Sequence, residues 1–255
     1  MSTNNGDYQQ RLIGVVVPCA NPAVEPEIHK LLPPNYIPYV TRLPFYPDLS
    51  LKERLAAYVL DLPDSIRTLE SLKLNGVYVA CTGSSYPIFL SGDRNWTNAA
   101  SIQLGAPVVS AAGSVARVLE KLNRKKLFVI SPYPNWLTYE LEAFWQSAGY
   151  EIIATIGMDK SGAIYDVGFN QVKSALNSAI EKTRKDPDAV ILFAGTGVPT
   201  LSAIDSLPDV TNTPVVTSQL AGIWNLLSEA GFADEIDLTP SLSLKRLNKH
   251  VIAGE

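Results

Sequence analysis

The stretch GVYVACTGSSYPIFL, residues 76–90, decides the fold once it is set beside AVILFAGTGVPTLSAI, residues 189–204. Both begin with an apolar, β-branched run that is typical of a buried strand, and both continue into a turn that contains Thr and Gly. Cys81 in the first stretch aligns with Gly195 in the second, an offset of 114 residues. This agreement indicates an internal repeat.

Two further pairs of segments support the repeat. GVVVPCANP at residues 14–22 resembles KLFVISPYPN at residues 126–135, with the same offset of 114. GAPVVSAAGSVARVLEKL, from residue 105, resembles NTPVVTSQLAGIWNLLSEAG, from residue 212, with an offset of 107. Because three pairs occur in one order, chance is a poor explanation, and we predict two similar halves.

Short apolar runs alternate with stretches of helical periodicity, which is the pattern of parallel sheets covered by helices. We expect strands at Leu12–Val17, Gly76–Ala80, Pro107–Val109, Leu127–Ile130, Glu151–Ile156, Ala189–Phe193 and Pro214–Val216. We expect the clearest helices at Ser50–Lys73 with an interruption at Pro63, at Asn135–Ala148, and from Ser110 or Ala111 to Leu122.

The predicted fold class is α/β, with two pseudo-symmetric doubly wound parallel-sheet halves. The first half comprises residues 1–112 and 221–255, and the second comprises residues 113–220. Because ligands of such sheets bind at the carboxyl ends of the strands, we expect the active site in the cleft between the two halves. No linker rich in Gly or Ser separates the halves, which indicates a close interface.

Composition excludes several classes of protein. The chain has 255 residues, 46% of them hydrophobic, and a net charge of -4 with no basic stripe, so we expect no nucleic-acid partner. No apolar run approaches the roughly 20 residues that cross a bilayer, and the opening residues are polar, so we expect a cytoplasmic protein without membrane contact. Two cysteines and two histidines lack metal-ligand spacing, so we predict no metal and no cofactor. A homo-oligomer is left open.

Cys81 is the first candidate for chemistry. It ends an apolar strand, and a helix start in the following Thr-Gly-Ser-Ser would direct N–H groups and a positive dipole end at the sulfur. The alternative is a buried, inert thiol, and local sequence does not separate the two. Thr82, Gly83 and Ser84 offer hydroxyls and an accessible backbone to a carboxylate or an enediolate, while helix capping by Ser84 or Ser85 is the structural alternative.

The second half and the first strand offer further candidates. The turn that follows the equivalent strand has the same Thr-Gly pair as the Cys81 turn, at Gly195, Thr196 and Gly197. Tyr133 could donate its phenolic hydroxyl to a substrate or simply pack among prolines. Asn21 could bind a carboxylate or form a turn before Pro22. Cys19 aligns with Tyr133 in the repeat, so we interpret it as a wall residue of the cleft.

These residues resemble the aspartate/glutamate racemase superfamily, and most closely its maleate isomerase and arylmalonate decarboxylase branch. The matching motifs are VVPCANPAVEPE at 16–27, ACTGSSY at 80–86, SPYPNWLT at 131–138, GTGVPTLSAI at 195–204 and TPVVTSQLAGIW at 213–224. Racemases and maleate isomerases of the superfamily have two facing cysteines, at the positions of Cys81 and Gly195. Arylmalonate decarboxylases have one, at the position of Gly195, and a glycine at the position of Cys81. This chain therefore has the mirror arrangement.

The resemblance also implies roles for other residues. Thr82, Tyr133 and the backbone of Gly83 and Thr196 would stabilise a carboxylate or enediolate, and Asn21 resembles the carboxylate ligand of the isomerases. Two positions depart from the decarboxylase pattern, because decarboxylases have Ser in place of Gly83 and Gly in place of Thr196.

A single thiol constrains the reaction. Two-base racemisation requires a proton donor on each face of the planar intermediate, so it is the least expected activity. We expect a cofactor-independent decarboxylase of a disubstituted aryl or alkenyl malonate, with Cys81 as the proton donor and Gly195 freeing space for a bulky substituent. The first alternative is a maleate-like cis–trans isomerase with Cys81 as the nucleophile. The second is an inactive protein that binds a small carboxylate or dicarboxylate.

Overall fold

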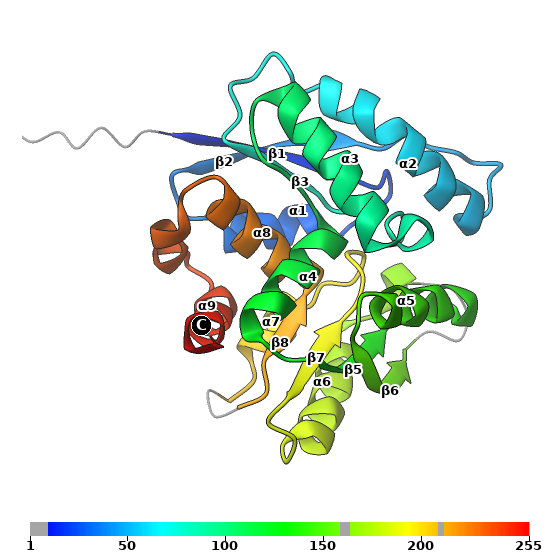
Figure 1. Cartoon of the computed structure of the whole chain (residues 1–255), viewed down its shortest axis with the longest axis vertical. Coiled ribbons are helices and arrows are strands. Elements are labelled where there is room, and N and C mark those ends of the chain that lie inside the picture. Colours follow the sequence, from blue (N-terminus) through cyan, green and yellow to red (C-terminus); the bar gives the residue numbers. More distant parts are fainter. Residues whose placement is uncertain (1–9, 159–163, 209–211, 255) are drawn as a thin grey trace, which may run out of the picture.

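The computed structural model describes residues 10–158, 164–208 and 212–254, which form two four-stranded parallel sheets (Figure 1). The first sheet has the order β2-β1-β3-β4 and the second has the order β6-β5-β7-β8, so both place equivalent strands at equivalent positions. The strands are β1 Arg11–Val17, β2 Tyr36–Arg42, β3 Gly76–Val79, β4 Val108–Ser110, β5 Lys126–Ser131, β6 Glu151–Gly157, β7 Ala189–Phe193 and β8 Val215–Thr217. The predicted fold class is confirmed.

Strand β2 is absent from the sequence-based prediction, although its partner in the other half, β6, was expected. The segment YIPYVTR contains Pro38 and alternates poorly between buried and exposed positions. It forms the edge of the first sheet and pairs only with β1. Proline removes one backbone donor, which an edge strand tolerates because one of its sides has no neighbouring strand.

The α-helices cover both faces of each sheet and follow the strands in the chain. They are α1 Val24–Leu31, α2 Leu51–Arg67, α3 Phe89–Leu104, α4 Ala111–Leu122, α5 Asn135–Ser147, α6 Phe169–Thr183, α7 Leu201–Asp205, α8 Ser218–Glu229 and α9 Leu242–Gly254. Short 3-10 turns lie at Tyr86–Ile88, Ile164–Asp166 and Ala233–Leu238.

Helix α2 differs from its prediction in two respects. It continues through Pro63 without interruption and it ends at Arg67 instead of Lys73. A capping box between Ser50 and Glu53 fixes its start. The buried residues Leu55, Tyr58, Leu62 and Ile66 recur every three or four positions along one face. Their burial offsets the one hydrogen bond that the proline removes.

A helix was also expected to start directly after Cys81, and this prediction is wrong. Residues 82–85 form a turn, a 3-10 turn follows, and α3 begins only at Phe89, whose φ is 55°. Neither Ser84 nor Ser85 caps a helix, because the Ser84 hydroxyl donates to the Cys81 carbonyl and the Ser85 hydroxyl donates to Asp93. The Cys81 sulfur therefore faces a turn and not the end of a helix.

The two halves are joined by the helices that follow their last strands. Helix α8 leaves β8 of the second sheet and packs against β3 and β4 of the first, while α4 leaves β4 and also packs against β8. Gly222 in α8 permits this approach, because a Cβ there would lie 2.3 Å from the Tyr78 ring. The Tyr78 hydroxyl donates to the Ser218 carbonyl at 2.9 Å.

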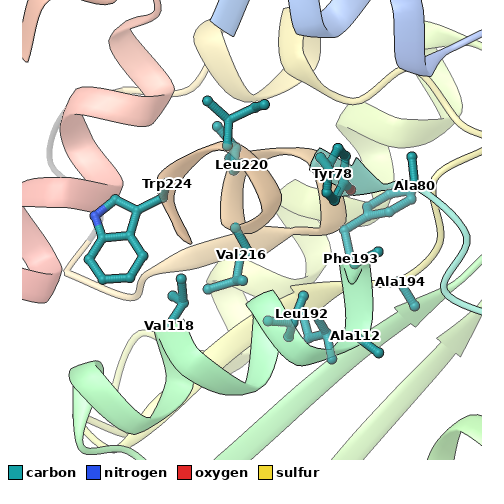
Figure 2. Close-up of a cluster of buried hydrophobic side chains, with 14 of the residues drawn as sticks. Tyr78, Ala80, Ala112, Val118, Leu192, Phe193, Ala194, Val216, Leu220 and Trp224 are labelled. Carbon is teal, nitrogen blue, oxygen red and sulfur yellow. The ribbon is translucent and has the colours of Figure 1, made fainter. Parts of the chain in front are cut away.

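Figure 2 shows the core at this junction. Tyr78 and Ala80 of the first half lie beside Phe193 and Ala194 of the second, and side chains of α4 and α8 complete the cluster. The predicted division at residues 112 and 221 stays a prediction. Across the described ranges, no helix combines the length and the apolar character that spanning a membrane would take.

Candidate active site

A cavity of about 80 Å³ lies between the halves at the carboxyl ends of the central strands. The turns after β1, β3, β5 and β7 and one face of α2 form its wall. Its lining residues are Pro18, Cys19, Ala20, Asn21, Leu51, Arg54, Leu55, Tyr58, Cys81, Thr82, Gly83, Tyr133, Pro134, Leu137, Ile164, Tyr165, Thr196 and Gly197. Of the predicted site residues, only Ser84 and Gly195 do not line it.

The Cys81 thiol is buried at the end of β3, with 3% of the residue exposed. Burial raises the pKa of this thiol above its ordinary value of 9.0, because the thiolate loses hydration. Hydrogen bonding from the Ser84 side chain and backbone opposes this effect but does not overcome it. The thiol is therefore protonated at neutral pH, which suits a proton donor. Ser84 itself acts on the turn and does not contact the cavity.

Gly195 occupies the mirror position of Cys81, but the space beside it is not free. Its φ is 84°, a left-handed conformation that favours glycine. A Cβ built there would lie 2.7 Å from the Tyr133 hydroxyl and 3.0 Å from the ring carbon that bears it. The expectation of room for a bulky substituent at Gly195 is therefore wrong, since the Tyr133 phenol fills that volume.

Tyr133 thus stands where a second thiol would project into the cavity. It is buried, and its ring meets the Tyr86 ring edge to face at 6.1 Å between centroids. Burial raises the pKa of the Tyr133 phenol well above its ordinary value of 10.0. The hydroxyl consequently stays protonated and can donate a hydrogen bond to an anionic oxygen.

Thr196 and Asn21 tie the two halves together at the base of the cavity. The Thr196 hydroxyl donates to the Ala80 carbonyl at 2.9 Å, across the interface. The Asn21 amide donates to the Thr196 carbonyl and hydroxyl, each at 3.2 Å, and its oxygen accepts from the N–H groups of Ala23 and Val24. The turn role considered for Asn21 is therefore present, and its role as a carboxylate ligand stays a prediction.

Thr82 lies beside Cys81, with its hydroxyl 3.2 Å from the Ser218 hydroxyl. Gly83 and Gly197 expose backbone to the cavity from opposite halves, as the repeat predicted. Cys19 also lines the cavity, as expected for a wall residue, and its sulfur lies 3.7 Å from the Tyr58 hydroxyl. Both thiols of the chain therefore border one cavity.

Sequence reasoning missed the contribution of α2. Leu51, Arg54, Leu55 and Tyr58 follow the spacing i, i+3, i+4, i+7, so one helical face lines the cavity. Tyr165, from a separate loop, was missed as well. The spacing was visible in the sequence, but nothing in it distinguished a face turned toward a cavity from one turned toward a core.

The cavity combines a buried thiol from one half with phenol, hydroxyl and backbone donors from both halves. The protein is therefore an α/β protein with a small-ligand cavity at a pseudo-symmetric interface. A family model described as arylmalonate decarboxylase matches residues 13–240, and the chain belongs to this family. Its members are enzymes, so the predicted enzyme family and the predicted branch of the superfamily are confirmed.

Individual relatives come from both sides of this branch. A maleate isomerase from Alcaligenes faecalis is 24% identical over 240 residues, which cover 88% of this chain and 92% of the relative. The Nocardia farcinica maleate cis-trans isomerase, solved as a cysteine-to-serine mutant with a covalently bound succinylcysteine intermediate, superposes with a TM-score of 0.75 at 18% identity, covering 94% of this chain and 98% of that one.

An arylmalonate decarboxylase mutant with one glycine changed to cysteine and one cysteine changed to serine, in its liganded form, gives a TM-score of 0.67 at 22% identity. The match covers 87% of this chain and 93% of that one. At these identities the solved structures support the fold, while the choice between decarboxylation and isomerisation depends on the site.

Proposed function

We propose that this protein decarboxylates a substituted malonate, with Cys81 as the proton donor. The observation that supports this reaction is the buried, protonated Cys81 thiol on one side of the cavity, opposite Gly195, which provides no second thiol. One donor on one face suits a reaction that adds a single proton and does not suit two-base racemisation.

The proposed reaction balances with the residues at hand. The bond between the α-carbon and one carboxylate breaks, CO2 leaves, and the electron pair passes into the retained carboxylate to form an enediolate. The Tyr133 and Thr82 hydroxyls and the backbone N–H groups of Gly83 and Thr196 would stabilise this anion. The Cys81 S–H bond then gives its proton to the α-carbon, and solvent returns a proton to the thiolate.

The wall of the cavity fits the loss of CO2. Leu51, Leu55, Pro134 and Leu137 line it with apolar surface. A carboxylate held against such a surface is poorly solvated, and its loss as neutral CO2 relieves that cost. The volume of about 80 Å³ lies well below the roughly 300 Å³ at which ligand pockets usually begin, so we propose a small substituent in preference to an aryl group.

The mirror placement of the thiol predicts the stereochemistry. Because arylmalonate decarboxylases resemble this chain but have their cysteine at the position of Gly195, protonation here would reach the opposite face of the enediolate. Chiral chromatography should therefore give a product of inverted handedness. The usual enantiomer, or a racemate, contradicts the assignment of Cys81 as the donor.

A second candidate is a maleate-like cis–trans isomerase, which the positive charge of Arg54 in the cavity favours because maleate keeps both carboxylates. The Cys81 thiolate would add to one alkene carbon, the electron pair would move into the distal carboxylate, and rotation with loss of the thiolate would give the trans isomer. One thiol suffices for this cycle. The succinylcysteine of the Nocardia farcinica enzyme is an adduct of this kind.

The pH dependence separates the two roles of Cys81. A donor must be protonated, so decarboxylation would continue through neutral pH and decline only as pH rises through the raised pKa of the thiol. A nucleophile must be ionised, so isomerisation would accelerate over the same range. The measurement is kcat/KM from pH 6 to 10 on whichever substrate turns over.

The identifying experiment is a screen of methyl-, ethyl-, alkenyl- and phenylmalonate and maleate, followed by CO2 release and proton NMR. Wild type is compared with Cys81→Ala, and Cys19→Ala is the matched control because it removes the other thiol of the same cavity. Loss of CO2 that needs Cys81 but not Cys19 supports the decarboxylase. Formation of fumarate from maleate without release of CO2 supports the isomerase instead. Silence on every substrate counts against both and leaves a binding protein.

A further inference from the structure

Arg54 is the only charged residue among the described residues that line the cavity. Its Nε atom is buried and has no hydrogen-bond partner in the described part of the chain. Several other arginines are paired with carboxylates, as in Arg11 with Glu235, Arg42 with Glu25 and Arg67 with Asp64. The Arg54 guanidinium therefore borders the cavity of the thiol without an acidic partner from residues 10–158, 164–208 and 212–254.

The position of Arg54 in α2 is unfavourable for the helix alone. Arg54 is the fourth residue of a 17-residue helix, where the positive end of the helix dipole repels a cation. A site of this kind, where a local rule is broken without a compensating contact, is expected where function requires it. An anion in the cavity would supply the compensation, because both the guanidinium and the helix end attract it.

The neighbours of Arg54 suit a carboxylate. Tyr58 lies one turn along the same face, and among the described residues its hydroxyl has the weakly bonding Cys19 sulfur, at 3.7 Å, as its hydrogen-bond partner. A planar guanidinium binds a carboxylate through two parallel hydrogen bonds, and a phenol can add a third. Leu51 and Leu55 of the same helix also line the cavity, so apolar surface lies close to the guanidinium.

We propose that Arg54 binds a second carboxylate of the substrate, one that remains in the product. This inference rests on the proposed function, since it concerns a substrate at the Cys81 site. The group is not the carboxylate that leaves as CO2, because an ion pair with Arg54 would stabilise that carboxylate in the ground state and oppose its loss. The substrate class is then a small malonate whose substituent ends in a carboxylate, such as carboxymethylmalonate.

Succinate is the probe that tests this inference without requiring turnover. It is the product of carboxymethylmalonate decarboxylation and the saturated analogue of maleate, so it suits the site under either reaction. Succinamate has the same length but replaces one carboxylate by a neutral amide. Binding of both ligands is measured by titration calorimetry to wild type, Arg54→Gln, Arg54→Lys and Arg67→Gln, the last being an exposed arginine at the far end of the same helix.

Wild type and Arg67→Gln should bind succinate more tightly than succinamate, by roughly 10-fold or more. Arg54→Gln should remove this preference by weakening succinate and leaving succinamate nearly unchanged. Arg54→Lys should keep part of it, because a point charge replaces a bidentate fork. Thermal unfolding provides a check on structure, since Arg54→Gln should melt at the wild-type temperature or slightly above it.

Three outcomes overturn the inference. One is an equal loss of both ligands in Arg54→Gln, which assigns Arg54 a structural role. Another is a preference for succinate that survives the substitution. The third is no binding of succinate to wild type. These outcomes are distinct from failure of the proposed function, because a protein that binds succinate through Arg54 but neither releases CO2 nor forms fumarate keeps the carboxylate site at Arg54 and loses the proposed reaction.

Discussion

The ends of β3 and β7 occupy equivalent places in two sheets of the same order, yet they do different work. After β3 the chain has Cys81, a buried thiol, and after β7 it has Gly195, whose Cβ position is covered by the Tyr133 phenol from the turn after β5. Both ends continue with Thr and then Gly. The comparison teaches that the repeat determines where the cavity is located, whereas one residue in each copy determines which side of the cavity carries a thiol.

The largest expected effect comes from removing the donor on each side in turn. Cys81→Ala should lower kcat on the best substrate by roughly 1,000-fold, since it deletes the group that moves a proton. Tyr133→Phe should lower it by roughly 100-fold, since it deletes one hydrogen bond to the developing anion. Steady-state kinetics of wild type and both variants measure the two losses of kcat. Equal losses would mean that the two sides share one role, which contradicts the asymmetry.

Adding a methyl group at residue 195 tests why this position is glycine. Gly195→Ala should lower the free energy of unfolding by about 2–4 kcal/mol, because a left-handed backbone and an overlap with Tyr133 both oppose a methyl group. Gly105→Ala is the matched control, since Gly105 also has a positive φ, of 69°, but faces open space. It should lose only about 1 kcal/mol. The free energies of unfolding are measured in urea. If both variants lose the same amount, the overlap with Tyr133 does not explain the glycine at residue 195.

A buried carboxyl makes the interface sensitive to pH. Glu27 of α1 accepts hydrogen bonds from the N–H groups of Thr200 and Leu201 in the other half, each at 2.5 Å. Burial raises its pKa from 4.5 to about 7, so the folded state binds the proton more tightly than the unfolded chain does. The stabilisation is complete below about pH 4.5 and is lost as pH rises through 7.

Glu27→Gln keeps the acceptor oxygen and removes this titration. Between pH 5 and 8.5, wild type should lose up to about 3 kcal/mol of stability relative to the variant, and the variant should be the more stable at the alkaline end. Chemical unfolding at four pH values measures the difference. Parallel curves for the two proteins would show that Glu27 does not titrate in this range.

The smallest effect concerns helix caps that the repeat reproduces. Ser110 accepts a hydrogen bond from the Gly113 N–H at the start of α4, and Thr217 accepts one from the Leu220 N–H at the start of α8. Thr217→Ala should cost about 1 kcal/mol. Ser110→Ala should cost more, because its hydroxyl also donates to the buried Asp93 carboxylate. Thermal melts that rank the two variants in reverse contradict this account.

Much of the fold could be predicted from sequence because the same order of strands and helices occurs twice, once in each half. The strand before Cys81 and the strand before Gly195 each support the other, and together they predict the cleft. Strand β2 escaped because Pro38 and an exposed edge disrupt the alternation on which such predictions rest. The helix expected after Cys81 failed because Phe89, not the Ser pair, is where α3 begins.

The site was predictable only as far as strand ends determine it. Cys81, Thr82 and Tyr133 follow strands and therefore meet at one cavity. Arg54 comes from a helix, and no local signal states that its side chain borders a thiol instead of solvent. The Tyr133 hydroxyl fills the place beside Gly195 because two strands lie at a particular position relative to each other. A linear comparison of the repeats contains no information about that position.

The contact between Tyr133 and Gly195 also constrains how this protein can evolve. A mutation that introduces cysteine at residue 195 would require the Tyr133 phenol to shift, so we expect it to be harmful by itself. In the opposite order, a mutation that shortens Tyr133 removes the proposed hydrogen-bond donor to the anion before any second thiol is present. We therefore expect each change to be deleterious alone, a relation between two sites that is called sign epistasis. A lineage with Tyr133 in this rotamer would then cross a fitness valley before it gained a second thiol.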